Sequence, residues 1–187
     1  MDDFAHLSVL ISIVLGLGIT NLLMGLARVI QMRDRVKVYW PTLVWAFTLL
    51  LVHVQTWWAM FGLRALDTWT FQAFAITLLQ PILLFFLSAL ALPDFDRDEA
   101  LDLRANYFAQ ARWFFGILLA LVFASLLRSV VVMGRLQDPA DLIFHVVFIV
   151  ASVGSMIVTN ETYHKVVAPL GAAVYLFYIA LLFTALR

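Results

Sequence analysis

Hydrophobic residues fall into six long runs that are separated by short polar segments. A helix rises about 1.5 Å per residue, so about 20 mostly apolar residues are needed to cross the hydrocarbon core of a membrane. The runs cover residues 4–30, 40–62, 69–92, 111–134, 140–159 and 165–186. We therefore predict an all-α integral membrane protein, a single domain over residues 1–187 that forms a bundle of six transmembrane helices.

The prolines support this division of the chain. Pro41, Pro139 and Pro169 fall in or near predicted first turns, where the missing backbone N–H costs little. The longest connection, residues 93–110, is too short for a soluble catalytic domain. We expect it to extend the fourth helix on the cytoplasmic side, because it carries acidic residues suited to a helix N-terminus. These are Asp96, Asp98 and Glu99.

Composition agrees with a membrane protein. Hydrophobic residues make up 64% of the chain and charged residues 13%, against about 45–50% and about 25% in soluble domains. Twelve Lys and Arg balance twelve Asp and Glu, so there is no basic excess of the kind that binds nucleic acid. The absence of cysteine excludes disulfides, thiolate catalysis and cysteine-ligated metals. We expect a multi-pass protein of a cell membrane, of the bacterial inner-membrane type, with the lipid bilayer as its main partner.

The orientation follows from the positions of lysine and arginine, which are enriched in cytoplasmic loops. Eight fall on one side of the predicted bundle: Arg28, Arg33, Arg35, Lys37, Arg97, Arg104, Arg112 and Lys165. Four fall on the other: Arg64, Arg128, Arg135 and Arg187. Both termini are therefore predicted to be non-cytoplasmic.

The fifth predicted helix carries a polar stripe. At 100° per residue, its members occupy an arc about 80° wide. They are Asp141, His145, Phe148, Ser152, Ser155 and Thr159, of which all but Phe148 are polar. One interpretation is that the five polar residues line a hydrated path. The other is a stripe of small residues that packs against a neighbour, with hydroxyls bonded to carbonyls four residues earlier.

The first predicted helix has small residues on two opposite faces. Ser12 and Gly16 lie on one face, and Gly18, Asn21 and Gly25 lie on the other. Small residues allow close helix packing in membranes. We predict that these five residues pack against neighbours on both sides, and hence that the helix lies at the centre of the bundle.

Ionisable groups within the spans are costly in lipid and are therefore candidates for function. From the non-cytoplasmic ends, Arg128 lies about 9 Å deep, His145 about 8 Å and His53 about 13 Å. We predict that His53, Arg128 and His145, with Asp141, form an outer vestibule that attracts anions or responds to pH, and that the loop holding Arg64 and Asp67 covers the same mouth. In the alternative, Arg128 extends to the lipid headgroups and a backbone carbonyl satisfies each histidine.

No HExxH or GxSxG motif is present, so an enzyme is the less favoured interpretation of the sequence. The leading hypothesis is an ion channel or small-solute transporter, acting as a homo-oligomer, with an ion or small anion in a polar path along the fifth helix. One alternative is a non-transporting membrane subunit or scaffold of a larger complex. Another is a redox protein with b-type haem between His53 and His145; otherwise no cofactor is expected.

Overall fold

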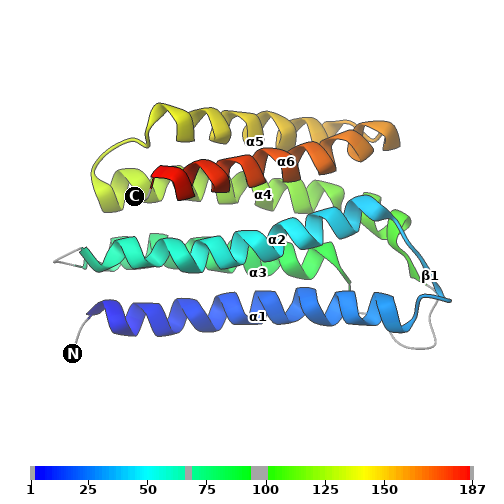
Figure 1. Cartoon of the computed structure of the whole chain (residues 1–187), viewed down its shortest axis with the longest axis horizontal. Helices are drawn as coiled ribbons and strands as arrows, with labels where there is room; N and C mark the ends of the chain where they lie inside the picture. The colour runs from blue at the N-terminus through cyan, green and yellow to red at the C-terminus, as the bar shows by residue number, and fades with distance from the viewer. Residues whose placement is uncertain (1–2, 66–68, 94–100, 186–187) are drawn as a thin grey trace.

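The computed structural model describes residues 3–65, 69–93 and 101–185, and these residues are almost entirely helical (Figure 1). The elements are α1 (Asp3–Gln31), β1 (Val36–Lys37), α2 (Trp40–Ala59), the 3-10 helix η1 (Met60–Ala65), α3 (Phe71–Ala91), β2 (Leu101–Asp102), α4 (Leu103–Met133), α5 (Pro139–Ile157) and α6 (Glu161–Ala185). Within these ranges, six helices are long and apolar enough to cross a membrane, as the sequence predicts.

The helices run back and forth, so that α1 begins and α6 ends at one end of the bundle (Figure 1). We call this end the terminal end, and the opposite end, which holds β1 and β2, the strand end. Within the described residues, the strand end carries more basic side chains. It has Arg28, Arg33, Arg35, Lys37, Arg104, Arg112 and Lys165, against Arg64, Arg128 and Arg135 toward the terminal end. Arg97 and Arg187 lie outside the described residues.

The fourth helix is longer than its hydrophobic run, as expected, and begins at Leu103. Asp102 caps it: its Oδ1 accepts hydrogen bonds of 3.0 Å from the backbone N–H groups of Arg104 and Ala105. The three acidic residues at 96, 98 and 99 that predicted this extension lie outside the described residues.

The sixth helix also begins earlier than its hydrophobic run, at Glu161. Asn160 precedes it and accepts a 2.8 Å hydrogen bond at Oδ1 from the N–H of Thr162. Pro169 therefore lies inside α6 and not near its first turn, which corrects the expectation from the sequence. Capping by a polar residue, and not the onset of hydrophobicity, sets this helix start.

A short parallel pairing of β1 with β2 joins two loops at the strand end. Val36 pairs with Leu101 and Lys37 with Asp102. The N–H of Leu101 donates a 3.2 Å hydrogen bond to the carbonyl of Arg35. The pairing ties the connection between α1 and α2 to the residues immediately before α4; the hydrophobic pattern does not predict it.

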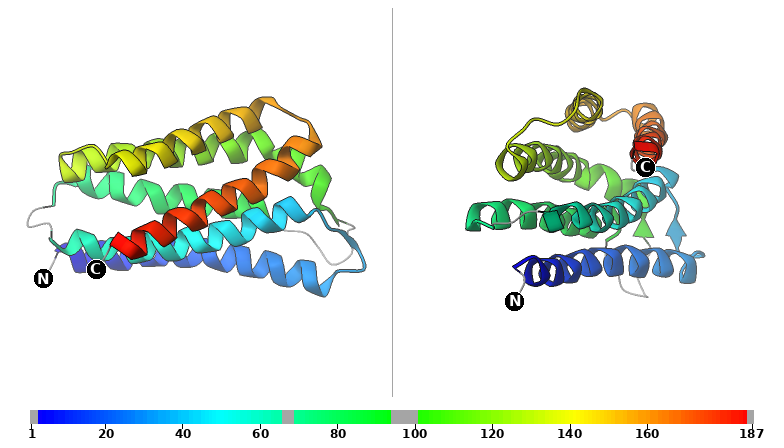
Figure 2. Two further views of the ribbon diagram at one scale, coloured as in Figure 1. Left: turned by 45° about the horizontal axis from the view of Figure 1, so that its top comes forward. Right: turned by 60° about the vertical axis from the view of Figure 1, so that its left-hand side comes forward.

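Helix α1 lies along one side of the bundle and α5 along the opposite side, with the other long helices between them (Figures 1 and 2). The main neighbours of α1 are α2 and α3. The prediction of a central first helix is therefore wrong. One small-residue face packs, whereas the other is exposed at Gly16 and Thr20. The Thr20 hydroxyl bonds its own helix there, at the carbonyl of Gly16 (2.8 Å).

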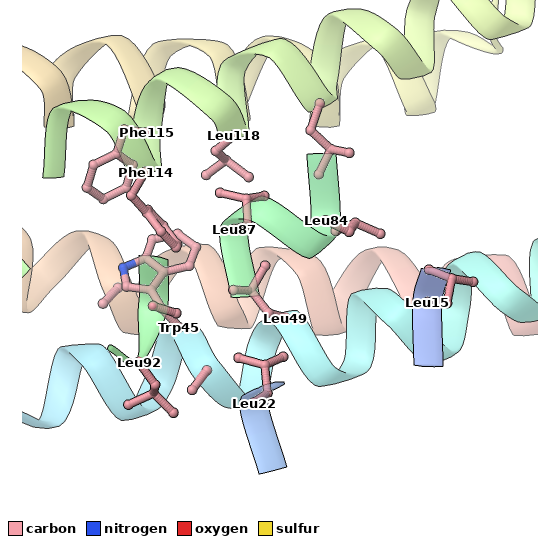
Figure 3. Packing of buried hydrophobic residues seen from close by; sticks show 14 of the residues in the cluster. Leu15, Leu22, Trp45, Leu49, Leu84, Leu87, Leu92, Phe114, Phe115 and Leu118 are labelled. Carbon is pink, nitrogen blue, oxygen red and sulfur yellow. The ribbon is translucent and has the colours of Figure 1, made fainter. Parts of the chain in front are cut away.

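The apolar core lies among α1, α2, α3 and α4 (Figure 3). Trp45 of α2 meets Phe114 and Phe115 of α4 edge to face, with both ring-centroid distances 5.6 Å. Leucines of all four helices belong to the same cluster: Leu15, Leu22, Leu49, Leu84, Leu87 and Leu118. The α5–α6 hairpin packs on this four-helix unit through α4 and α2. It forms one wall of the cavities described next.

Candidate functional site: two adjoining cavities

A cavity of about 170 Å³ lies between the four-helix unit and the α5–α6 hairpin, toward the terminal end. We call it the inner cavity. Its apolar walls include Leu118, Phe144 and Phe148. Its polar lining comes from five helices and one loop: Gln55, Thr56, Gln80, Ser125, Arg128, Gln137, His145, Tyr175 and Tyr178.

A second cavity, of about 160 Å³, lies at the connection between α4 and α5 and is here called the mouth cavity. Arg135, Asp138 and Asp141 contribute to its lining. Three residues line both cavities: Arg128, Gln137 and Tyr178. These three polar side chains therefore form the boundary between the inner cavity and the mouth cavity, which lies closer to the terminal end.

Arg128 is the strongest electrostatic feature at this boundary. It is half-buried, and no carboxylate among the described residues lies within 4 Å of its guanidinium. Asp141 and Tyr178 line the mouth cavity together with Arg128, but Asp141 does not form an ion pair with the guanidinium. A guanidinium stays protonated in proteins, so Arg128 gives the inner cavity a fixed positive charge.

A hydrogen-bonded chain fixes one wall of the inner cavity. His145 donates from Nδ1 to the carbonyl of Asp141 (2.7 Å), so its Nε2 accepts from the Ser125 hydroxyl (3.2 Å). Gln137 in turn donates from Nε2 to Ser125 Oγ (3.4 Å). Two buried oxygens that belong to residues of this lining, Thr56 Oγ1 and Gln137 Oε1, have no hydrogen-bond partner.

The polar stripe of the fifth helix does not face one continuous cavity. Asp141 lines the mouth cavity and His145 the inner cavity. Ser155 and Thr159 line a third cavity of about 530 Å³ near the strand end, although Thr159 lies just beyond the end of α5. Ser152, between the two groups, is 1% exposed and its hydroxyl has no hydrogen-bond partner. The stripe is therefore closed at Ser152, and neither serine makes the hydrogen bond to its own helix that the packing interpretation expects.

The structure brings together only part of the predicted vestibule. Arg128 and His145 line the same cavity, but His53 lies buried at the α1–α2–α3 interface against Gly18. Arg64 stacks over the Phe61 ring, 4.6 Å from its centroid, and lines neither cavity. Asp67 lies outside the described residues.

The two histidines proposed as haem ligands do not fit a shared haem. His53 Nδ1 bonds the carbonyl of Leu49 (2.7 Å), and its Nε2 lies 3.4 Å from Ser88 Oγ. Both nitrogens of His145 also have partners, and only His145 lines the inner cavity. Each histidine has the carbonyl partner that the alternative interpretation expects.

The five residues of α1 that the sequence predicts to pack differ between the two faces of the helix. An added Cβ would overlap His53 at Gly18 and would lie 2.6 Å from Leu92 Cβ at Gly25, so this face packs closely. Asn21 on the same face is half-buried. On the other face Ser12 is half-buried and Gly16 is exposed, with nothing within 4 Å of an added Cβ.

Several lining residues escape the sequence analysis. Gln55, Thr56 and Ser125 stand in mainly apolar helices without a stripe of their own, and Gln137 lies in the short polar connection between α4 and α5. They lie toward the terminal-end parts of their helices or in the connection between α4 and α5, but this depth alone does not show that they face one cavity.

Comparisons of the chain with models of protein families, with curated proteins and with solved structures find no match. The cavities and their side chains therefore carry the functional assignment.

Proposed function

We propose that the chain is a multi-pass membrane protein that forms a small-solute transporter or channel, and that its inner cavity binds a small anion or anionic solute. The observation that carries this proposal is Arg128, a fixed positive charge at a polar cavity with no carboxylate within 4 Å among the described residues.

The exposed surface of α5 supports a lipid environment. The buried residues of this helix are Ser152 and Ser155. Its outward side chains are apolar, with Ile143, Val150 and Ile157 between 64% and 74% exposed. Polar residues inside and apolar residues outside are what a helix in contact with lipid requires, because lipid cannot hydrogen-bond a side chain.

The inner cavity suits a small anion better than a cation. An arginine within the membrane is costly unless it is paired or hydrated, and an anionic solute supplies the missing charge. Neutral hydrogen-bonding groups, including the unpartnered oxygen of Thr56, surround the cavity. Its volume is below the roughly 300–1,000 Å³ of sites for drug-sized ligands, so we propose a solute of few heavy atoms.

The proposed path follows the inner face of α5 from the mouth cavity through the inner cavity to the cavity near the strand end. Tight packing at Ser152 separates the last two cavities. Passage of a solute then requires movement of α5 relative to α4, its neighbour. The α5–α6 hairpin is the candidate moving unit, because the apolar core lies almost entirely in the other four helices.

The test is anion flux into liposomes that contain the purified protein. Chloride and acetate are the probes, and Arg128→Gln is the principal variant. Arg64→Gln is the control, since Arg64 lies toward the same end but lines neither cavity. We expect flux in the wild type and the control, and loss of at least about tenfold in Arg128→Gln.

Two outcomes would contradict the proposal. Equal flux in Arg128→Gln and the wild type would remove Arg128 from the path. No flux of either anion in folded wild-type protein would favour the alternative of a non-transporting subunit or scaffold, which copurification with a partner from native membranes would identify.

A further inference from the structure

The cavity near the strand end, which we call the strand-end cavity, has a charge distribution unlike that of the inner cavity. It lies between the first turns of α4, the end of α5 and the start of α6. Its lining includes two arginines, Arg104 and Arg112, and no acidic residue among those that the structure describes. Its volume is about 530 Å³. It therefore combines positive charge with considerable space.

The nearest acidic group is already engaged. Glu161 Oε2 lies 2.8 Å from both Nε and Nη2 of Arg104, and its Oε1 lies 2.7 Å from Nζ of Lys165. Arg112 has no ion pair with any described residue. The Glu161 carboxylate thus pairs with both Arg104 and Lys165. The guanidinium of Arg112 is left to bind an anion at the cavity.

A buried donor adds a second, independent indication of a ligand. Ser155 lines the strand-end cavity, is 2% exposed, and its hydroxyl has no hydrogen-bond partner. A buried polar group without a partner destabilises the protein, and a ligand oxygen at this position satisfies it. His164 also lines the cavity but has a structural role, because its nitrogens bond the hydroxyl of Tyr107 (3.0 Å) and the carbonyl of Val158 (2.7 Å).

The rest of the wall is apolar and includes Phe108, Ala109 and Met156. Trp113, the residue next to Arg112, is 70% exposed, and tryptophan favours the boundary between lipid and water. Basic pockets between helices at this depth bind the head groups of anionic lipids. The cavity thus offers an anion site on one wall and apolar contacts on another.

We infer that the strand-end cavity binds the phosphate group of an anionic ligand, with the Arg112 guanidinium and the Ser155 hydroxyl as its contacts. The phosphate belongs either to a membrane phospholipid or to a free phosphate compound, since both present the same oxygens to these groups. This site is distinct from the inner cavity and lies at the strand end of the proposed path, and ligand binding to it is measured without transport.

The experiment measures retention of phosphatidylglycerol by the detergent-purified full chain, by native mass spectrometry. Glycerol phosphate and inorganic phosphate are titrated in parallel as the free ligands. Arg112→Gln and Ser155→Ala are the variants, and Arg33→Gln is the matched control because Arg33 is exposed near the strand end and does not line the cavity. Circular dichroism verifies that each variant is folded.

We expect binding to fall about tenfold or more in Arg112→Gln and less in Ser155→Ala, with no change in Arg33→Gln. Loss confined to phosphatidylglycerol assigns the site to lipid, and loss of glycerol phosphate or inorganic phosphate binding assigns it to a free ligand. The inference is overturned if no probe binds, or if Arg33→Gln weakens binding as much as Arg112→Gln does.

Discussion

Gly18 of α1 and His53 of α2 are in direct contact, and a Cβ atom added to Gly18 would overlap the imidazole of His53. His53 is fully buried and is held by a hydrogen bond to its own helix. Neither partner has room to withdraw, because α3 closes the same interface through Ser88. The absence of a side chain at Gly18 thus allows α1 to approach α2 closely at this point.

This contact predicts opposite effects for two glycine substitutions on one helix. Gly18→Ala should destabilise the protein by about 1–3 kcal/mol, as overpacking of a buried interface does. Gly16→Ala is the control, because an added Cβ there meets nothing within 4 Å. It should be neutral or stabilising by up to about 1 kcal/mol through helix propensity. Thermal unfolding in detergent gives both values, and equal melting temperatures would contradict the close packing.

A second prediction concerns the closed point of the proposed path. Ser152→Leu should abolish solute flux, because a larger side chain at this buried position prevents the path from opening. Ser155→Leu should do the same at the strand-end cavity. Val150→Leu is the control, since Val150 is 66% exposed and faces outward. Unchanged flux in folded Ser152→Leu and Ser155→Leu would leave the stripe with a packing role only.

The third prediction concerns the cap of α4. Hydrogen bonds from the backbone N–H groups of Ala105 and Arg104 lower the pKa of the Asp102 carboxyl in the folded protein. The resulting stabilisation is fully present above the pKa of about 3.9 that aspartate has in an unfolded chain. It is lost as the pH falls through the lower pKa of the folded state.

Asp102→Ala should therefore melt at a lower temperature than the wild type at neutral pH, because the cap is removed. Asp102→Asn keeps a capping oxygen but cannot titrate. We expect the melting temperature of the wild type to approach that of Asp102→Asn as the pH is lowered toward about 3. A difference between them that does not change with pH would show that the carboxylate charge is unimportant at this cap.

The fourth prediction is the orientation in the membrane, which rests on the excess of basic residues at the strand end. The native chain has no cysteine, so single cysteines can be labelled without background. Exposed positions suit this test: Arg33 and Thr162 at the strand end, and Gly62 and Asp138 at the terminal end. An impermeant maleimide added to intact cells should label only the last two. Labelling at 33 and 162 instead would show that both termini are cytoplasmic.

Much of the fold follows from hydrophobicity alone. Each of the six apolar runs became one long helix, because any span of about 20 apolar residues must satisfy its backbone hydrogen bonds internally in lipid. The hydrophobic pattern does not predict where α4 and α6 begin, because capping hydrogen bonds to Asp102 and Asn160 set these helix starts. The pairing of β1 with β2 involves two residues from each strand, too few to leave a periodic pattern.

The candidate site was harder to predict because depth along a helix does not give rotation about its axis. Counting residues placed His53, Arg128 and His145 at similar depths, yet His53 faces α1 whereas the other two face the inner cavity. Gly16 is a second example: it belongs to a face of small residues, but a Cβ atom added there would meet nothing within 4 Å. A small residue on a helix face indicates that a neighbour can approach, but not that one does.

The strand pairing near Val36 and Leu101 has a consequence for biosynthesis. Both strands precede α4, α5 and α6 in the chain, so the ribosome makes them first. At about 5–20 residues per second, the α5–α6 hairpin follows seconds later. We expect the early helices to be joined at the strand end before the hairpin inserts, so that it docks on a preassembled base. Because the inner cavity lies between that base and the hairpin, the proposed binding site is completed only after α5 and α6 have been made.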